Sequence, residues 1–268
     1  MGAQEIEVDT ILFDMDGTLI DSTPALNATW IEFAREYDLD ADYVLHNSFG
    51  HRTTENLARY IPALTGDALA KEVVRFETRI LEIAEANRRK NAGTGSTEGM
   101  IVAMPGARAL LNEVRTRSAS ACALTLRQLN AGRAENPERR AGWAIVTSAK
   151  AFAAADVAAP PQAFVTGDDC ARGKPDPEPY LTGATRAHAQ NVAQCLVVED
   201  APPGVASGKA AGARVLGLCT TSDGGRMWAN GADFLVQDLR DVHAHWAGDR
   251  LLLTMDSAER PADASAAR

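Results

Sequence analysis

Short apolar runs alternate with amphipathic stretches over most of this chain. The first run, TILF at residues 10–13, has the composition of a buried parallel strand. Similar runs follow at residues 143–148, 163–166, 195–200, 213–218 and 233–238. Stretches with helical periodicity lie among them, at residues 105–117, 177–189, 203–211 and 224–230. This alternation predicts an α/β fold built on a doubly wound, Rossmann-like parallel sheet.

The periodicity changes between the first strand and the others. Over residues 22–90, apolar side chains such as Trp30, Phe33, Phe76 and Ile80 recur at helical spacing, and no segment reads as a strand. The first strand precedes this block and the remaining strands follow it. We therefore predict that an all-helical cap domain is inserted into the sheet domain.

Domain boundaries follow from these patterns. The predicted core comprises residues 1–20 and 101–253, and the inserted cap comprises residues 21–100, which end in a Gly/Ser/Thr-rich linker. Residues 118–141 are long for a helix-to-strand connection and lack a sustained apolar period, so we expect a peripheral insertion there. Residues 254–268 have the composition of a flexible tail.

Composition and charge narrow the range of partners. The 268-residue chain has a net charge of −9, which argues against a nucleic-acid or anionic-membrane partner because these need clustered Lys and Arg. No apolar run reaches membrane-spanning length, and the first residues contain no apolar signal core. The four cysteines are far apart, which suggests free thiols rather than zinc ligands. We expect a cytoplasmic protein, and we expect it to be a monomer.

Polar residues that could bind a ligand or take part in catalysis follow three of the predicted strands. Asp14 and Asp16 come after the first strand, Thr147 and Ser148 end the second, and Glu199 and Asp200 end the strand at 195–200. Ligands of open α/β sheets bind at the carboxyl ends of the strands, so these groups should meet there. Clustered carboxylates repel one another unless a cation lies among them, and Mg²⁺ favours carboxylates, water and phosphate oxygens. The sequence therefore predicts a Mg²⁺ site that handles a phosphate group.

The spacing of the first two aspartates suggests how that site could work. Asp14 and Asp16 are two residues apart and share one face of an extended chain, and Gly17 allows a sharp turn after them. One carboxylate could attack phosphorus and form an aspartyl-phosphate, while its neighbour acts as acid and then as base. Thr147 would hold a phosphoryl oxygen, and Lys174 would neutralise the nucleophile and the transferring group.

Four ordered motifs resemble those of the haloacid dehalogenase superfamily. They are DMDGT at 14–18, TS at 147–148, Lys174 within RGKPDPEPY, and VVEDAPPG at 197–204. The resemblance covers nearly the whole chain, and it identifies Asp14 as the nucleophile and Asp16 as the general acid and base. It implies that Asp200, with Glu199 beside it, completes the Mg²⁺ site with Asp14 and the backbone carbonyl of Asp16. It also implies substrate contacts from Gly17, Ser148 and Lys174, and a helical cap of the type inserted between the first two motifs.

Within that superfamily the sequence is most similar to glycerol-1-phosphate and 2-deoxyglucose-6-phosphate phosphatases. The cap stretch SFGHRTTENLARYIP at 48–62 resembles a loop that in these enzymes reaches into the site. Gly50 and Arg52 match that loop and are predicted to bind substrate, whereas Phe49 replaces its histidine. The prediction is therefore a Mg²⁺-dependent phosphatase of a small polyol or sugar phosphate, with glycerol phosphate favoured.

Two other functions use the same residues. A β-phosphoglucomutase-like isomerase would carry valine where Thr18 stands and a histidine soon after, and neither is found here. A catalytically silent binding protein would not need the intact set of Asp14, Asp16, Lys174 and Asp200. Both remain alternatives to hydrolysis.

Overall fold

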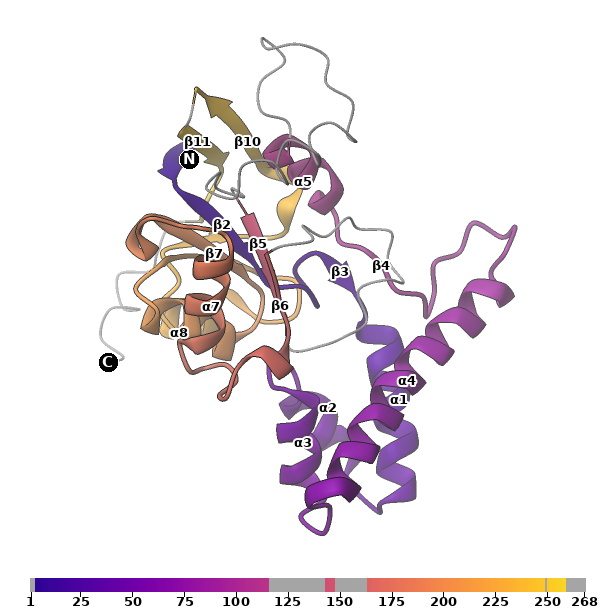
Figure 1. Ribbon diagram of the computed structural model, residues 1–268. Helices are drawn as coiled ribbons and strands as arrows, with labels where there is room; N and C mark the ends of the chain where they lie inside the picture. Colours follow the sequence, from indigo (N-terminus) through magenta and orange to yellow (C-terminus); the bar gives the residue numbers. More distant parts are fainter. Residues whose placement is uncertain (1–2, 116–142, 148–162, 249, 259–268) are drawn as a thin grey trace, which may run out of the picture.

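The molecule consists of an α/β core and a helical cap (Figure 1). The computed structural model describes residues 3–115, 143–147, 163–248 and 250–258. The cap contains four helices, α1 (Thr23–Glu36), α2 (Ala41–Asn47), α3 (Thr53–Tyr60) and α4 (Gly66–Lys90). The expected helical block at 22–90 is thus observed.

A six-stranded parallel sheet forms the centre of the core. Its strands are β2 (Thr10–Phe13), β5 (Trp143–Val146), β6 (Phe164–Val165), β7 (Cys195–Glu199), β8 (Arg214–Leu218) and β9 (Phe234–Val236). They lie in the order β6-β5-β2-β7-β8-β9, and every neighbouring pair is parallel. The sheet confirms the predicted α/β fold class. Because β2 has β5 on one side and β7 on the other, its carboxyl end is the switch point where such sheets bind ligands.

Alternate side chains of β2 face two separate hydrophobic cores. Ile11 and Phe13 belong to one core together with the apolar residues of the cap, and Leu12 belongs to the other. The helices divide in the same way. Helix α5 (Ala107–Arg115) contributes to the first core, while α7 (Glu178–Arg186), α8 (Pro202–Ala210) and α9 (Gly224–Ala229) contribute to the second. Both faces of the sheet are therefore covered, as the apolar strands require.

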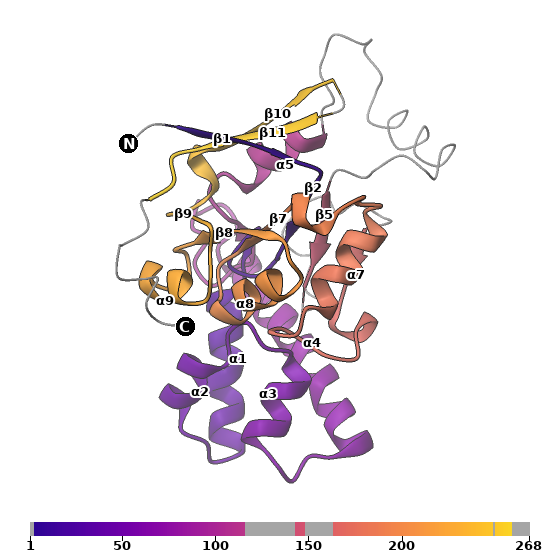
Figure 2. The same ribbon diagram turned by 90° about the vertical axis from the view of Figure 1, so that its left-hand side faces the viewer.

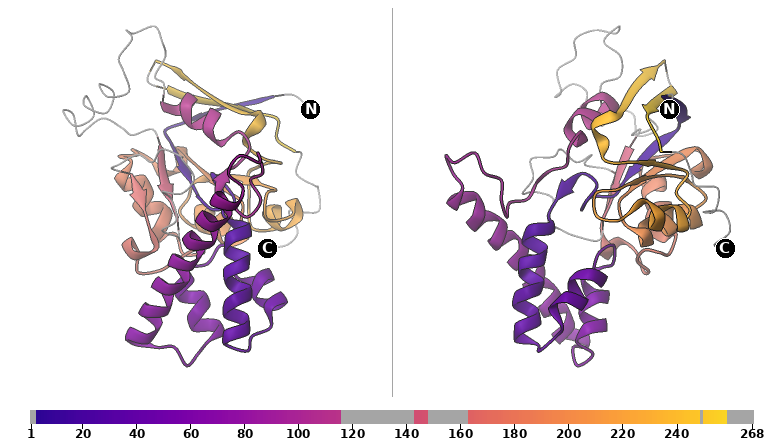
Figure 3. Two further views of the ribbon diagram at one scale, coloured as in Figure 1. Left: turned by 90° about the vertical axis from the view of Figure 1, so that its right-hand side faces the viewer. Right: turned by 180° about the vertical axis from the view of Figure 1, so that it is seen from behind.

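Aromatic packing holds the cap helices together. Helices α1 and α4 lie side by side (Figure 3). Between them Phe76 packs against Trp30 and Phe33, with ring centroids 4.4 and 4.8 Å apart. These are the residues whose helical spacing predicted the cap, and they form its interior.

A second, three-stranded antiparallel sheet was not predicted. It contains β1 (Gln4–Val8), β11 (Arg250–Met255) and β10 (Val242–Ala247), in that order, and lies beyond α5 from the main sheet (Figure 2). The predicted start of the flexible tail at residue 254 is therefore too early, because Thr254 and Met255 belong to β11. Met255 is buried, and the hydroxyl of Ser257 accepts a hydrogen bond from the amide of Leu235 at 2.9 Å.

The remaining elements are short. Strands β3 (Ile20–Asp21) and β4 (Val102–Ala103) pair where the chain enters and leaves the cap. Turns of 3₁₀ helix in the described residues span Gly167–Asp169, Val192–Gln194 and Leu239–Asp241. The predicted insertion at 118–141 and the residues from 259 onward lie outside the described residues. Among the helices described, none combines the length and apolarity that crossing a membrane would need.

Candidate active site

The carboxyl end of β2 carries both aspartates of the DMDGT motif. The amide of Asp14 continues the sheet pairing by donating to Val198 at 2.9 Å. Met15 is completely buried, so Asp14 and Asp16 are turned away from the core as the spacing predicted. Gly17 follows with a φ of +85°, and a β-carbon there would collide with the carboxylate of Asp200. Glycine thus serves both the turn and the close approach of the two acidic motifs.

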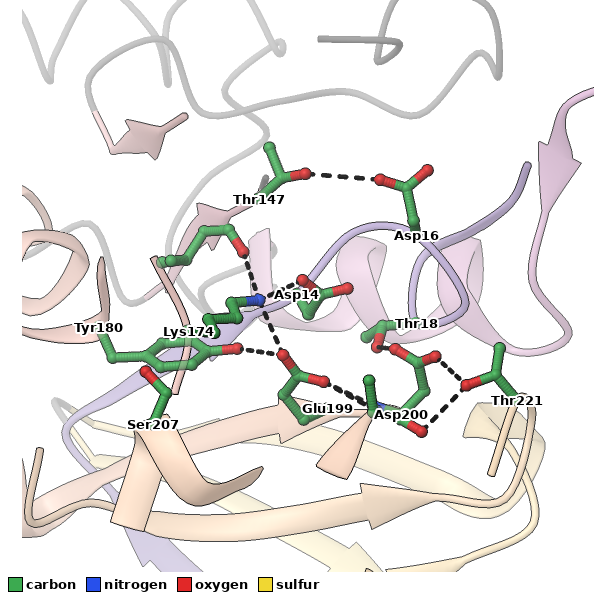
Figure 4. A network of polar contacts seen from close by, with 12 residues as sticks. Asp14, Asp16, Thr18, Thr147, Lys174, Tyr180, Glu199, Asp200, Ser207 and Thr221 are labelled. Atoms are coloured by element: carbon green, nitrogen blue, oxygen red, sulfur yellow. Dashed lines mark hydrogen bonds and ion pairs between the residues drawn. The ribbon is translucent and has the colours of Figure 1, made fainter. Parts of the chain in front are cut away.

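Lys174 lies between two of the predicted acids (Figure 4). The lysine is only 4% exposed, and its Nζ donates to Asp14 Oδ1, to Glu199 Oε1 at 2.7 Å and to the carbonyl of Val146 at 3.3 Å. Burial alone would lower the pKa of Lys174, but the negative charges of Asp14 and Glu199 raise it overall. The lysine is therefore a fixed positive charge beside Asp14.

All acceptor positions of Glu199 are filled by protein donors. Its Oε1 accepts from Lys174 and from the hydroxyl of Tyr180 at 2.8 Å, and its Oε2 accepts from the amides of Asp200 and Ala201 at 2.9 and 3.0 Å. A carboxylate has about four such positions. Glu199 thus holds Lys174 and the turn after β7, and its part in the metal site stays a prediction.

Asp200 completes a compact acidic cluster. One carboxylate oxygen from each of Asp14, Glu199 and Asp200 lies within 4.8 Å of the others. Burial, followed by the charge of Glu199, raises the pKa of Asp200 to about 7, and burial raises that of Asp14. The carboxylate oxygens of Asp200 also accept hydrogen bonds from the hydroxyls of Thr18 and Thr221. Buried carboxylates this close favour a divalent cation among them, so the donor set fits Mg²⁺.

The side chain of Asp16 stands apart from this cluster. Its carboxyl group accepts hydrogen bonds from the hydroxyl of Ser22 at 2.5 Å and from that of Thr147 at 3.5 Å. Burial raises the pKa of Asp16, which favours its protonated form. The two aspartates of one motif therefore have different surroundings, a charged cluster for Asp14 and neutral hydroxyls for Asp16.

A cavity of about 360 Å³ opens between these carboxylates and the cap. Asp14, Asp16 and Asp200 line its core end. Its cap walls combine polar and apolar side chains: Ser48, Phe49, His51, Thr53 and Asn56 from the loop and start of α3, and Leu26, Trp30, Val74, Phe76, Ile80 and Leu81 from α1 and α4. Val74 is the most exposed apolar side chain of this wall, at 59%.

The two predicted cap residues, Gly50 and Arg52, lie in different positions relative to the cavity. Gly50, with a φ of +77°, lines the cavity, but its close approach is to the core, because an added β-carbon would lie 2.9 Å from that of Ala201. Arg52 does not line this cavity. Its guanidinium group binds main-chain carbonyls of residues 167–171 in the core, so it is not in the position expected of a substrate ligand.

Two further predictions concern residues near the site. The backbone N–H of Gly17 donates to Ile20 at 2.7 Å, and its carbonyl accepts from Thr220 at 2.6 Å, so Gly17 shapes the turn instead of offering its amide to a substrate. Ser148 lies outside the described residues. Sequence reasoning missed Tyr180 and Ser22, although Tyr180 ends the quoted RGKPDPEPY motif and could have been suspected there.

The sheet, the inserted cap and the acidic cluster at the switch point define a class of hydrolytic enzymes. Residues 8–212 match the family of haloacid dehalogenase-like hydrolases, and the chain belongs to this family. It is 30% identical to glycerol-1-phosphate phosphohydrolase 1 of Saccharomyces cerevisiae, over 88% of this chain and 85% of that protein. It is 32% identical to 2-deoxyglucose-6-phosphate phosphatase 1 of the same yeast, over 89% of this chain and 91% of that protein.

Solved structures confirm the fold. A hydrolase from Pseudomonas syringae superposes with a TM-score of 0.61 at 24% identity, covering 87% of this chain and 95% of that one. The chain is thus a member of the haloacid dehalogenase-like hydrolase family with a helical cap. The predicted resemblance to the two kinds of yeast phosphatase is confirmed.

Proposed function

We propose that this protein is a Mg²⁺-dependent phosphatase that hydrolyses small polyol or deoxysugar phosphates through an aspartyl-phosphate at Asp14. The observation that carries this proposal is the contrast between the two aspartates. Asp14 lies beside the fixed charge of Lys174, which suits a nucleophile, whereas the carboxyl group of Asp16 accepts hydrogen bonds from the neutral hydroxyls of Ser22 and Thr147, which suits an acid.

In the first step the carboxylate of Asp14 attacks phosphorus and the ester P–O bond breaks. Asp16 gives its proton to the departing alkoxide, so the alcohol leaves neutral. In the second step Asp16 takes a proton from water, the resulting hydroxide attacks phosphorus, and the Asp14–phosphate bond breaks to release inorganic phosphate. Lys174 and Thr147 would stabilise the phosphoryl oxygens as charge develops on them.

Asp14 and Asp200 are the side chains that would hold Mg²⁺, with the backbone carbonyl of Asp16 as the resemblance implies. The ion would neutralise phosphoryl charge and allow the buried carboxylates to stay ionised. Glu199 contributes charge to this site while its oxygens hold Lys174 and the following turn.

The substrate proposal rests on the cavity and on the relatives. The loop and the start of α3 offer hydroxyl, amide and imidazole groups to the cavity, while α1 and α4 offer mainly hydrocarbon together with the polar side chains of Glu77 and Thr78. A lining with this much hydrocarbon fits an alcohol that carries few hydroxyls. The two yeast relatives are described as acting on glycerol 1-phosphate and 2-deoxyglucose 6-phosphate. We therefore place glycerol phosphate first and 2-deoxyglucose 6-phosphate second, with modest selectivity between them.

The test is a measurement of kcat/KM for glycerol phosphate, 2-deoxyglucose 6-phosphate, glucose 6-phosphate and a nucleoside monophosphate, with inorganic phosphate as the product. Preference for either of the first two supports the proposal. Preference for glucose 6-phosphate or for the nucleotide contradicts the substrate assignment. Isomerisation of a hexose 1-phosphate without net phosphate release would favour the mutase. The monomeric state and cytoplasmic location stay predictions.

A further inference from the structure

Arg52 binds the core of the molecule from the cap side. It is the residue that precedes α3, and its side chain is only 16% exposed. Nη1 donates to the carbonyls of Gly167 and Cys170 at 3.1 and 3.0 Å, and Nη2 donates to that of Ala171 at 3.1 Å. One cap side chain thus bonds three main-chain carbonyls of a single core segment, residues 167–171.

The guanidinium group is itself held in place. Nε of Arg52 donates to Glu55 Oε1 at 2.9 Å, and Glu55 lies in the first turn of α3. A planar guanidinium group with donors on three nitrogens can bond these four acceptors together. A lysine ammonium is a point charge with three donors on one nitrogen, and it cannot reproduce this planar arrangement of donors.

The bound segment leads directly to Lys174. The core holds the same segment from its other side, because Glu178 accepts hydrogen bonds from the amides of Ala171 and Arg172 at 2.8 and 3.0 Å. Its carbonyls are therefore held by the cap and its amides by α7. Arg52 and Lys174 also line one small cavity together with Thr147.

Gly173 shows how closely the two domains fit at this point. A β-carbon on Gly173 would lie 2.5 Å from Nε of Arg52 and 2.7 Å from Oε1 of Glu55. Its φ is not in the left-handed region, so backbone conformation does not require glycine here. The space that glycine leaves is filled by the Arg52–Glu55 pair.

We propose that Arg52 is a positioning residue, which couples the seating of the cap to the placement of Lys174 beside Asp14. When the cap swings away, the three bonds to the 167–171 carbonyls break together, and the segment before Lys174 is held only from the α7 side. When the cap closes, they form together. Arg52 thus acts on catalysis through Lys174 and not through contact with substrate.

This role predicts a particular kinetic signature. Misplacing a catalytic group by about 1 Å can cost roughly 100-fold in rate. For Arg52→Ala we expect kcat to fall by about 10- to 100-fold, with KM changed less than about threefold. Arg52→Lys should recover little of the loss because of its point-charge geometry, and added guanidinium ion should restore part of kcat in Arg52→Ala but none in Arg52→Lys.

Arg79→Ala is the matched control. Arg79 is also a cap arginine, but within the described residues its ion pairs are with Glu32 and Glu82, both in the cap, at 2.7 and 3.0 Å. We expect its removal to leave kcat within about twofold of the wild type. An equal loss of kcat in Arg79→Ala would overturn the proposal, since any damage to cap surface charge would then suffice.

Gly173→Ala approaches the same contact from the core. The added methyl group should displace the Arg52 side chain and lower kcat in the wild-type background. In the Arg52→Ala background it should have much less effect, because the group it would strike is gone. Additive losses, or a rise in KM with kcat unchanged, would refute coupling through this contact.

A measurement that needs no substrate separates this proposal from the proposed function. Amide hydrogen exchange of residues 167–173 should become faster in Arg52→Ala and in Arg52→Lys, and stay unchanged in Arg79→Ala. Faster exchange would support the coupling even if the wild-type protein hydrolysed none of the phosphates tested. Unchanged exchange in both Arg52 variants would overturn it, whatever the activity.

Discussion

Replacing Tyr180 by phenylalanine removes a single hydroxyl from the most buried part of the site. That hydroxyl donates to Glu199 Oε1 at 2.8 Å, and the two residues are 0% and 1% exposed. The ring itself stays in place, 5.0 Å from Lys174 Nζ, so no large cavity forms. The variant therefore isolates one hydrogen bond to a buried carboxylate.

The size of the effect can be worked from these contacts. A hydrogen bond to a charged group contributes about 1.5–3 kcal/mol to the free energy of unfolding. Glu199 Oε1 keeps its bond to Lys174 at 2.7 Å, so the carboxylate does not become unpaired and the cost should stay within that range. For a domain of this size, 1 kcal/mol corresponds to about 2–4 °C in Tm, so we expect Tm to fall by about 3–12 °C.

Urea unfolding of wild type and Tyr180→Phe measures this difference directly. Tyr43→Phe is a suitable control because Tyr43 is 57% exposed, and we expect its free energy of unfolding to change by less than about 0.5 kcal/mol. If Tyr180→Phe is as stable as the wild type, the buried bond to Glu199 contributes nothing and the reasoning is wrong. A loss far above 3 kcal/mol would show instead that the whole Lys174–Glu199 network collapses with it.

Three further predictions concern the site. Asp14→Asn should abolish turnover and keep the fold, because an amide cannot attack phosphorus; substantial activity in the folded variant would contradict the assignment. EDTA should stop hydrolysis and Mg²⁺ should restore it, whereas full activity without metal would exclude the proposed ion. Gly204→Ala should lower both stability and kcat, because its β-carbon would overlap the carboxylate of Glu199; the reverse, a gain in stability from better helix propensity in α8, would show that Glu199 can move freely.

The parallel sheet could be predicted because its strands are buried on both faces. Residues such as Ile11, Leu12 and Phe13 must all be apolar when each side of the strand meets a core, and that leaves an uninterrupted signal in the sequence. The second sheet gives a weaker signal. In β10 the buried Val242 and Ala244 alternate with the exposed His243 and His245, so only every second residue is apolar and the run is too short to predict a strand from the sequence.

The same distinction explains the site. Asp14, Asp16, Lys174 and Asp200 could be predicted because they follow strands that converge on one sheet edge, so the order of elements already brings them together. Tyr180 belongs to helix α7, which packs on the face of the sheet opposite the cap residues, so its contact with Glu199 depends on how α7 packs against the sheet. Arg52 shows the limit most clearly, because whether its side chain points to the substrate or to the core depends on how the cap is seated.

The seating of the cap also links the cavity to the chemistry. Gly50 packs against Ala201, one residue from Asp200, and Arg52 binds the segment that leads to Lys174. The loop that lines the cavity therefore contacts the core next to Asp200 at one point and, through Arg52, at the segment that precedes Lys174 at another. Any alcohol that prevents this loop from seating would leave both groups less well placed, even with its phosphate bound. Differences between substrates should then appear in kcat as well as in KM, since the alcohol contacts the cap loop and the seating of that loop affects the placement of Asp200 and Lys174.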